Sequence, residues 1–177
     1  MRRPALAVCA LLALTSCATS GAESTGPAAS TTVQTTTAPR NAGSAPGSVI
    51  EFGTDYRFDS GLVVTVSGPK PFRPSESAYP RAERAAAFSV VVYNESGQPY
   101  RLSGLSVSAT ADDRAATQVV DPTQGFNGIV DADRDLPPGE IVRLSFAFVV
   151  PATTSPVRLT VRPDTSTPAR AIYTGTV

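Results

Sequence analysis

Three aspartates at alternate positions form a cluster of side chains whose spacing is typical of ion binding. Asp131, Asp133 and Asp135 could turn their carboxylates toward one calcium ion if the chain formed a tight loop there. An EF-hand loop beginning at Asp131 would need glycine at its sixth position and a bidentate acid at its twelfth, where this sequence has Leu136 and Val142. Two interpretations therefore stay open: a weak calcium site and a solvated acidic loop.

Residue types on which many enzymes depend are scarce in this chain. It has no histidine, which excludes a nucleophile activated by histidine and removes the usual imidazole ligands for zinc or copper. Paired carboxylates could hydrolyse glycosides, but there is no tryptophan to stack on a sugar. The glutamates Glu83, Glu95 and Glu140 fall in expected loops or turns. We therefore predict that the protein is not an enzyme and has no cofactor.

The N-terminal residues have the organisation of an export signal. Arg2 and Arg3 form a positive start, and the apolar run over residues 4–14 is too short to span a bilayer as a helix. The run ends in a motif that resembles a bacterial lipobox, formed by Leu14, Thr15, Ser16 and Cys17. This resemblance implies that residues 1–16 are a signal peptide and that Cys17 is lipidated after cleavage. An ordinary signal peptide cut near Ser20 is the alternative.

Lipidation of Cys17 would determine both location and redox context. Acyl chains on this residue would hold the protein in the cell membrane from outside the cytoplasm. Cys9 would be removed with the signal, so no free thiol or disulfide would remain, and the core alone would provide stability. Loss of Arg2 and Arg3 leaves 13 basic and 15 acidic residues, a side-chain charge of 13 − 15 = −2, which predicts no nucleic-acid partner.

The segment from residue 17 to residue 48 has the composition of a tether. It consists almost entirely of Thr, Ser, Ala, Gly and Pro, with too few large apolar residues to offset the entropy of ordering. We expect a disordered linker with a root-mean-square reach of roughly 30 Å. Its Ser, Thr and Pro content is also typical of O-glycosylated stalks. A single lysine, Lys70, and heavy use of Ala and Pro indicate a GC-rich genome such as those of actinobacteria.

Residues 49–177 have the pattern of an all-β domain. Short runs of alternating apolar and polar residues are separated by Gly, Pro, Asn and Asp, and no 3.6-residue apolar stripe is present. A helix over residues 77–87 is disfavoured because Pro80 lies inside it. We expect an immunoglobulin-like antiparallel β-sandwich of seven to nine strands without a disulfide. The expected strands cover residues 56–58, 62–66, 86–93, 100–102, 105–111, 117–120, 141–150, 157–162 and 171–177.

The order of several short motifs resembles a known family. The first motif, within residues 52–66, consists of Phe52, Gly53, Tyr56 and Phe58 followed by Gly61 and Leu62. The second is a Val-rich run that ends at Asn94. The third is the Pro137, Pro138, Gly139 turn, followed by a run that ends with Phe148, Val149, Val150 and Pro151. Over residues 50–177 the chain is similar to the lipoprotein-associated domains of unknown function of the 4352 family. The resemblance implies an immunoglobulin-like secreted domain and brings no catalytic residues.

These observations favour a non-catalytic binding or interaction module that is anchored in the cell envelope. We expect its partners to be the membrane, through the lipid on Cys17, and an envelope protein or glycan. Arg143, Arg158 and Arg162 on an outer sheet face, and Tyr79, Tyr93 and Tyr100, are candidates for contact with a partner. Solvated strand positions for the arginines and packing at the edge of the core for the tyrosines are the favoured explanations. The alternative function is a small-ligand or calcium-binding envelope protein that uses Asp131, Asp133 and Asp135.

Overall fold

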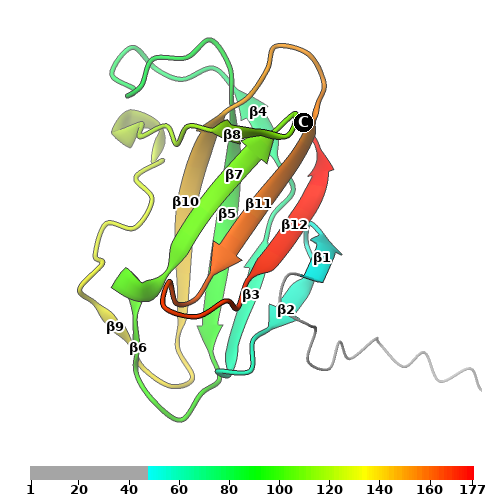
Figure 1. The fold of residues 1–177 in the computed structure, drawn as a ribbon. Helices are drawn as coiled ribbons and strands as arrows, with labels where there is room; N and C mark the ends of the chain where they lie inside the picture. The colour runs from blue at the N-terminus through cyan, green and yellow to red at the C-terminus, as the bar shows by residue number, and fades with distance from the viewer. Residues whose placement is uncertain (1–47) are drawn as a thin grey trace, which may run out of the picture. The chain divides into compact units, whose positions relative to one another are not determined.

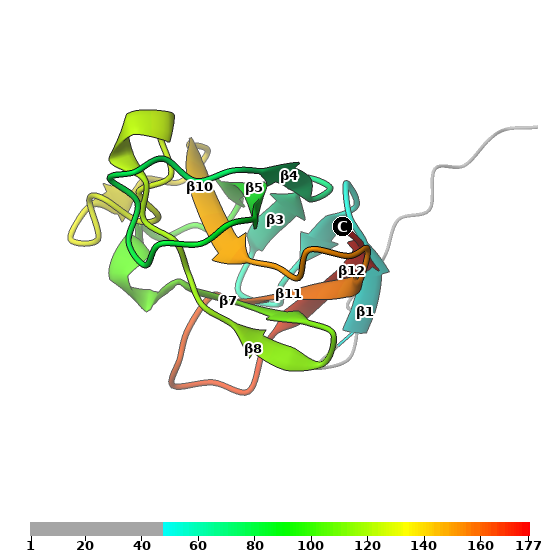
Figure 2. The same cartoon turned by 90° about the horizontal axis from the view of Figure 1, so that it is seen from above.

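The computed structural model describes residues 48–177, so the export signal, Cys17 and nearly all of the tether lie outside the described residues. Two five-stranded sheets pack face to face (Figures 1 and 2). The first sheet has the order β1 (Ser48–Glu51), β12 (Ala171–Thr176), β11 (Pro156–Arg162), β7 (Ser106–Ala111) and β8 (Arg114–Ala116). The second sheet has the order β10 (Ile141–Val149), β5 (Ala85–Asn94), β3 (Leu62–Val66) and β2 (Asp55–Arg57), and β4 (Lys70–Phe72) pairs with the start of β5.

Smaller elements connect the two sheets. β6 (Tyr100–Arg101) pairs with β9 (Asp135–Leu136), and two short 3-10 turns cover Leu102–Gly104 and Pro122–Gln124. The prediction of an immunoglobulin-like antiparallel sandwich is confirmed: of the twelve described strands, seven have four residues or more. One strand pairing is not antiparallel: β1 runs parallel to β12. The sandwich has no disulfide, since residues 48–177 contain no cysteine.

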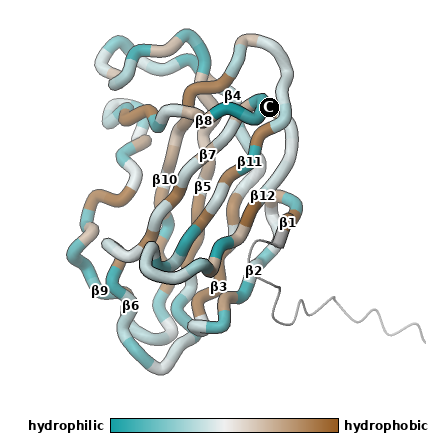
Figure 3. The backbone as a smooth tube through the Cα atoms, in the orientation of Figure 1, coloured by the Kyte–Doolittle hydropathy of each residue, from teal (hydrophilic) through white to brown (hydrophobic). Residues whose placement is uncertain are grey.

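The core lies between the sheets, and the alternation of residues along the strands produces it. In β5 every second residue from Ala86 to Asn94 is buried, and in β11 the buried residues are Val157, Leu159 and Val161. Successive side chains of a strand point to opposite faces, so one face of each sheet is apolar. Figure 3 shows this as hydrophobic segments along the strands of both layers. A hydrogen bond joins the layers, because the buried Tyr173 hydroxyl donates to the Val64 carbonyl at 2.6 Å.

Several short strands were not predicted from the sequence. β1, β4, β8 and β9 have four residues or fewer, which leaves too little alternation to recognise. The expected strand over residues 117–120 is only a set of isolated bridges, in which Gln118 pairs with Phe148 and Val120 pairs with Tyr79. No helix forms over residues 77–87; β5 begins at Ala85, in agreement with the sequence analysis.

Three turns between strands contain the Gly, Pro or Asp residues that favour chain reversal. β7 and β8 form a hairpin in which Asp112 and Asp113 have φ of 52° and 58°, as a type I′ turn requires. Asp59 and Ser60 precede Gly61, whose φ of 86° lets the chain reverse between β2 and β3. Pro137 to Gly139 form the turn that leads into β10.

A buried carboxylate fixes the long loop between β4 and β5. Asp121 is fully buried, and its two oxygens accept bonds from the Ser75 amide at 2.8 Å and hydroxyl at 2.7 Å, from Thr123 at 2.8 Å and from Gln124 at 3.1 Å. Burial alone would raise the pKa of the Asp121 carboxyl, but these hydrogen bonds outweigh it and hold the pKa below its usual range. We call these four residues the Asp121 cluster.

Candidate functional site

Three connections converge at one end of the sandwich and enclose a cleft of about 430 Å³. They are the β2–β3 turn, the segment between β5 and β6, and the β11–β12 loop, which lie toward the lower end of the molecule in Figure 1. We call it the terminal cleft. It is lined by Tyr56, Phe58, Asp59, Ser60, Leu62, Ser96, Pro99, Tyr100, Pro163, Asp164, Thr167 and Ala169. The volume lies in the range of small-molecule sites, about 300–1,000 Å³.

Aromatic and aliphatic side chains from the β2–β3 hairpin line one side of the terminal cleft. Tyr56 and Phe58 pack edge to face with ring centroids 4.7 Å apart, and both are buried, as is Leu62. Residues 56 and 58 lie two positions apart, so a strand directs both side chains to one face. The hairpin therefore gives the cleft a rigid apolar side.

A close approach of two backbones shapes the rim. The Glu95 amide donates to the Gly61 carbonyl at 3.0 Å, which holds the turn after β5 against the β2–β3 turn. A side chain at Gly61 would place its Cβ 2.9 Å from the Ser96 Cα, so only glycine fits here. Arg57 and Glu95 add an ion pair between the same two turns.

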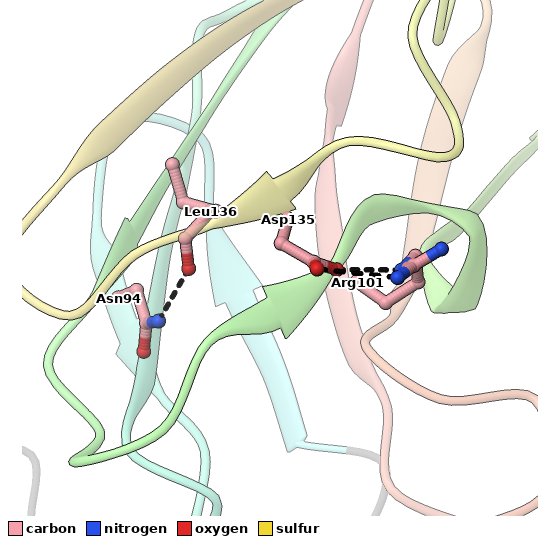
Figure 4. A network of polar contacts seen from close by, with 4 residues as sticks. All are labelled: Asn94, Arg101, Asp135 and Leu136. Atoms are coloured by element: carbon pink, nitrogen blue, oxygen red, sulfur yellow. Dashed lines mark hydrogen bonds and ion pairs between the residues drawn. The ribbon is translucent and has the colours of Figure 1, made fainter.

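The second wall is held in place by the side chain of Asn94. This residue is fully buried at the end of β5, and its amide donates at 2.8 Å to the carbonyls of both Gln98 and Leu136. Its carbonyl oxygen accepts from the Ser96 amide at 3.0 Å and hydroxyl at 2.6 Å. Figure 4 shows the Asn94–Leu136 contact, which ties the turn to β9. Every polar atom of the Asn94 side chain is thus used to shape this wall.

The β11–β12 loop closes the third side. The Tyr100 hydroxyl donates to the Pro163 carbonyl at 2.6 Å and so connects the β6 segment to this loop. Burial raises the pKa of Tyr100, with a further contribution from the Asp164 charge, and keeps the phenol neutral. The ring of Tyr100 lines the cleft while its hydroxyl is already bonded.

Two carboxylates face the terminal cleft from opposite sheets. Asp59 belongs to the β2–β3 turn, is exposed, and has no side-chain partner within the described residues. Asp164 belongs to the β11–β12 loop and accepts bonds from the Ser166 amide at 2.8 Å and hydroxyl at 2.7 Å. These bonds, helped by the charge of Arg162, lower the pKa of Asp164, so it stays ionised at neutral pH. The cleft combines apolar walls with two negative charges.

The three aspartates of the candidate calcium loop do not converge. Asp135 lies in β9, and its carboxylate forms a two-bond ion pair with Arg101, at 2.5 and 3.1 Å, across the β6–β9 pair (Figure 4). Asp131 lines a separate hollow of about 280 Å³, and Asp133 is exposed. Between residues 48 and 177, no three His, Cys, Asp or Glu side chains come close enough to hold a metal ion. The strand pairing that occupies Asp135 explains why the alternate spacing gives no site here.

The arginine and tyrosine candidates are also separated. Arg143 belongs to β10 in the second sheet, whereas Arg158 and Arg162 belong to β11 in the first, so they form no common stripe. Arg158 pairs with Asp113 at 2.7 Å. Arg162 donates to the carbonyls of its own loop.

Tyr100 is the one tyrosine of the predicted set that lines the terminal cleft. Tyr79 is 80% exposed and bridges Val120, and Tyr93 is half-buried in β5. Tyr56, Phe58, Asp59 and Asp164 were not predicted as site residues. The spacing of Tyr56 and Phe58 on one strand face was visible in the sequence, but nothing in it places them beside residues 163–169.

The lipobox residues Leu14, Thr15, Ser16 and Cys17 lie outside the described residues. Within residues 48–177 no helix has both the length and the apolar character needed to cross a bilayer.

Among the comparisons with known proteins, only the search of solved structures found matches. No family model matches the chain, and no curated protein matches it. The yjhA protein from Bacillus subtilis has a similar structure, with a TM-score of 0.50 and 14% sequence identity over 70% of this chain and 97% of that chain. An uncharacterized beta-sandwich protein from Clostridium difficile 630 aligns with a TM-score of 0.46 and 15% identity over 77% of this chain and 99% of that one. The chain is an all-β protein with an immunoglobulin-like β-sandwich.

Proposed function

We propose that this protein is an extracytoplasmic lipoprotein, similar to the 4352 family, that is held in the membrane by a lipid on Cys17 and binds a ligand without catalysis. The observation that carries the binding part is the terminal cleft, a concave apolar site of about 430 Å³ built from three connections on a rigid sandwich. Loops displayed at one end of a sandwich are a common position for binding residues.

Two features of the cleft favour binding over catalysis. Its polar groups are two aspartates and the hydroxyls of Ser60, Ser96, Thr167 and tyrosine, without a cysteine or histidine to act as nucleophile or base. The hydroxyls of Ser96 and Tyr100 are committed to structural hydrogen bonds, with Asn94 and Pro163 respectively. The remaining groups suit recognition of a ligand that is released unchanged.

The anchoring part is tested by the cysteine that should carry the lipid. The Cys17→Ala variant should move the protein from the detergent-soluble membrane fraction to the aqueous fraction and abolish incorporation of labelled palmitate. Cys9→Ala is the matched control, because that cysteine lies in the apolar part of the signal and should leave both readouts unchanged. Retention of Cys17→Ala in the membrane fraction, or an unlabelled wild-type protein, would overturn lipidation.

The binding part is tested with three probes of one shape: 4-phenylbutylamine, 4-phenylbutanol and 4-phenylbutyrate. Calorimetric titration of the full chain should detect at least one of them. Ser60→Trp, at the rim of the cleft, should abolish that binding, and Ser108→Trp, on an exposed position of β7 outside the cleft, should preserve it. Absence of binding by all three probes, or equal loss in both variants, would overturn the assignment of the cleft as a ligand site.

A further inference from the structure

The charges around the terminal cleft are one-sided. Its twelve lining residues include two aspartates and no lysine or arginine. The aspartates come from the β2–β3 turn and the β11–β12 loop, whose flanking strands belong to the two different sheets. A ligand in the cleft would therefore meet a negative charge from each of two connections.

Three basic residues that adjoin lining residues in the sequence have other partners. Arg57 forms its ion pair with Glu95, and Arg101 forms its pair with Asp135. Arg162 donates to the carbonyls of Thr165 and Thr167, and it acts on Asp164 only as a nearby charge. Arg170 ends the β11–β12 loop, just beyond the lining residues. Asp59 consequently has no neutralising cation among the described residues.

The apolar walls add a second attraction for positive charge. Tyr56, Phe58 and Tyr100 are the three aromatic residues among those that line the cleft. An ammonium or guanidinium group close to such a ring is attracted by the negative face of its π system. The same apolar walls would also remove the apolar body of a ligand from water, which favours binding. The aromatic lining and the two carboxylate residues together favour a cation that carries an apolar body.

We propose that the terminal cleft binds a small organic cation, a protonated or quaternary amine with an aliphatic or aromatic body, between Asp59 and Asp164. This inference rests on the proposed function of the cleft as a ligand site. An anionic ligand would face both carboxylates, and a neutral one would leave them without a partner.

The ranking of the three phenylbutyl probes tests the inference, because the probes differ only in their head group. In calorimetric titrations of the full chain at neutral pH, the amine should bind at least about tenfold more tightly than the alcohol, and the carboxylate most weakly. The affinity for the amine should fall as sodium chloride rises, because the carboxylates are partly exposed. The affinity for the alcohol should be insensitive to salt.

Variants of the two aspartates locate the effect. Asp59→Asn and Asp164→Asn should each reduce the amine-to-alcohol ratio, and the double variant should bring it close to one. Asp133→Asn, which removes an exposed acid outside the cleft, should leave the ratio unchanged. An alcohol or carboxylate that binds as well as the amine, or a ratio that survives the double variant, overturns the cation inference while leaving the cleft as a site. Absence of binding by every probe overturns the proposed function itself.

Discussion

The Asp121 cluster and the terminal cleft both place aspartates among loops, but Asp121 and Asp59 differ in how many internal hydrogen bonds their carboxylates accept. Asp121 is fully buried, and both of its oxygens are occupied by Ser75, Thr123 and Gln124. Asp59 is exposed beside apolar walls and has no partner among the described residues. A carboxylate whose bonds are all supplied internally stabilises a loop, whereas one left open beside an apolar concave surface is available to a ligand.

The largest effect on stability is expected from Asp121→Asn. An NH₂ group in place of Oδ2 would face the Ser75 N–H and the Gln124 side-chain amide, which are both donors, and one in place of Oδ1 would force the Ser75 and Thr123 hydroxyls to reverse. In either orientation the hydrogen bonds to a charged acceptor are lost. We expect Tm at pH 7 to fall by roughly 5–10 °C. Thermal unfolding followed by circular dichroism measures this, and Asp133→Asn provides an exposed control. A Tm equal to that of the control would mean that the cluster does not stabilise the loop.

The same variant has a defined pH dependence. The pKa of Asp121 is lower in the folded state than in the unfolded state, so its contribution to stability is present above pH about 4 and is lost as pH falls through the folded-state pKa. The difference in Tm between wild type and Asp121→Asn should therefore shrink on acidification below pH about 4. A difference that stayed constant to the lowest pH reached would contradict the depressed pKa.

The next largest effect is expected at the rim of the terminal cleft, from Gly61→Ala. Both Gly61 and Gly53 have a φ near 90°, at 86° and 88°, so an alanine at either position carries a conformational cost of about 1–2 kcal/mol. Only at Gly61 does the new Cβ meet a backbone, that of Ser96, whereas nothing lies within 4 Å at Gly53. Chemical denaturation should show Gly61→Ala to be less stable than Gly53→Ala by a further 1–3 kcal/mol or so. Gly61→Ala should also weaken probe binding, and equal effects of the two substitutions would show that the close contact does not shape the rim.

Substitutions of Tyr173 in the core and Tyr100 at the cleft wall should have smaller effects, and they allow the two regions to be compared. Tyr173→Phe removes the bond to Val64 across the sheets and should cost about 1 kcal/mol in denaturation experiments. Tyr100→Phe removes the bond to Pro163 at the cleft wall and should instead change probe affinity more than stability. Burial raises the pKa of both phenols, so stability should decline as pH rises beyond about 10, and each variant should lessen that decline. If Tyr173→Phe weakened probe binding more than Tyr100→Phe did, the bond from Tyr100 to Pro163 would not position the wall of the terminal cleft.

The sandwich could be predicted from the sequence because strands and turns leave patterns within a few neighbouring residues. The cleft could not be predicted in this way. Strict alternation in β5, β10 and β11, and turn residues such as Gly61 and Gly139, are visible within a few positions. The cleft joins residues about 100 positions apart in the chain, and no local pattern encodes that meeting. Asp135 is the opposite case, because a local pattern was visible but long-range pairing decided the outcome. The spacing of Asp135 suggested an ion site, but the pairing of β9 with β6 places its carboxylate in an ion pair with Arg101.

The smallest effect on stability is expected from Asp59→Asn, and it completes the comparison with Asp121. This side chain is exposed and makes no hydrogen bond or ion pair within the described residues, so its replacement by a near isostere should change the unfolding free energy by less than about 0.5 kcal/mol. Its effect on the affinity for 4-phenylbutylamine should nevertheless be several-fold. Parallel measurements of unfolding and amine binding on Asp59→Asn and Asp121→Asn should therefore give opposite patterns, with stability lost in one and affinity in the other. If Asp59→Asn lost stability as Asp121→Asn does, Asp59 would be structural, and the open carboxylate would no longer distinguish the cleft from the cluster.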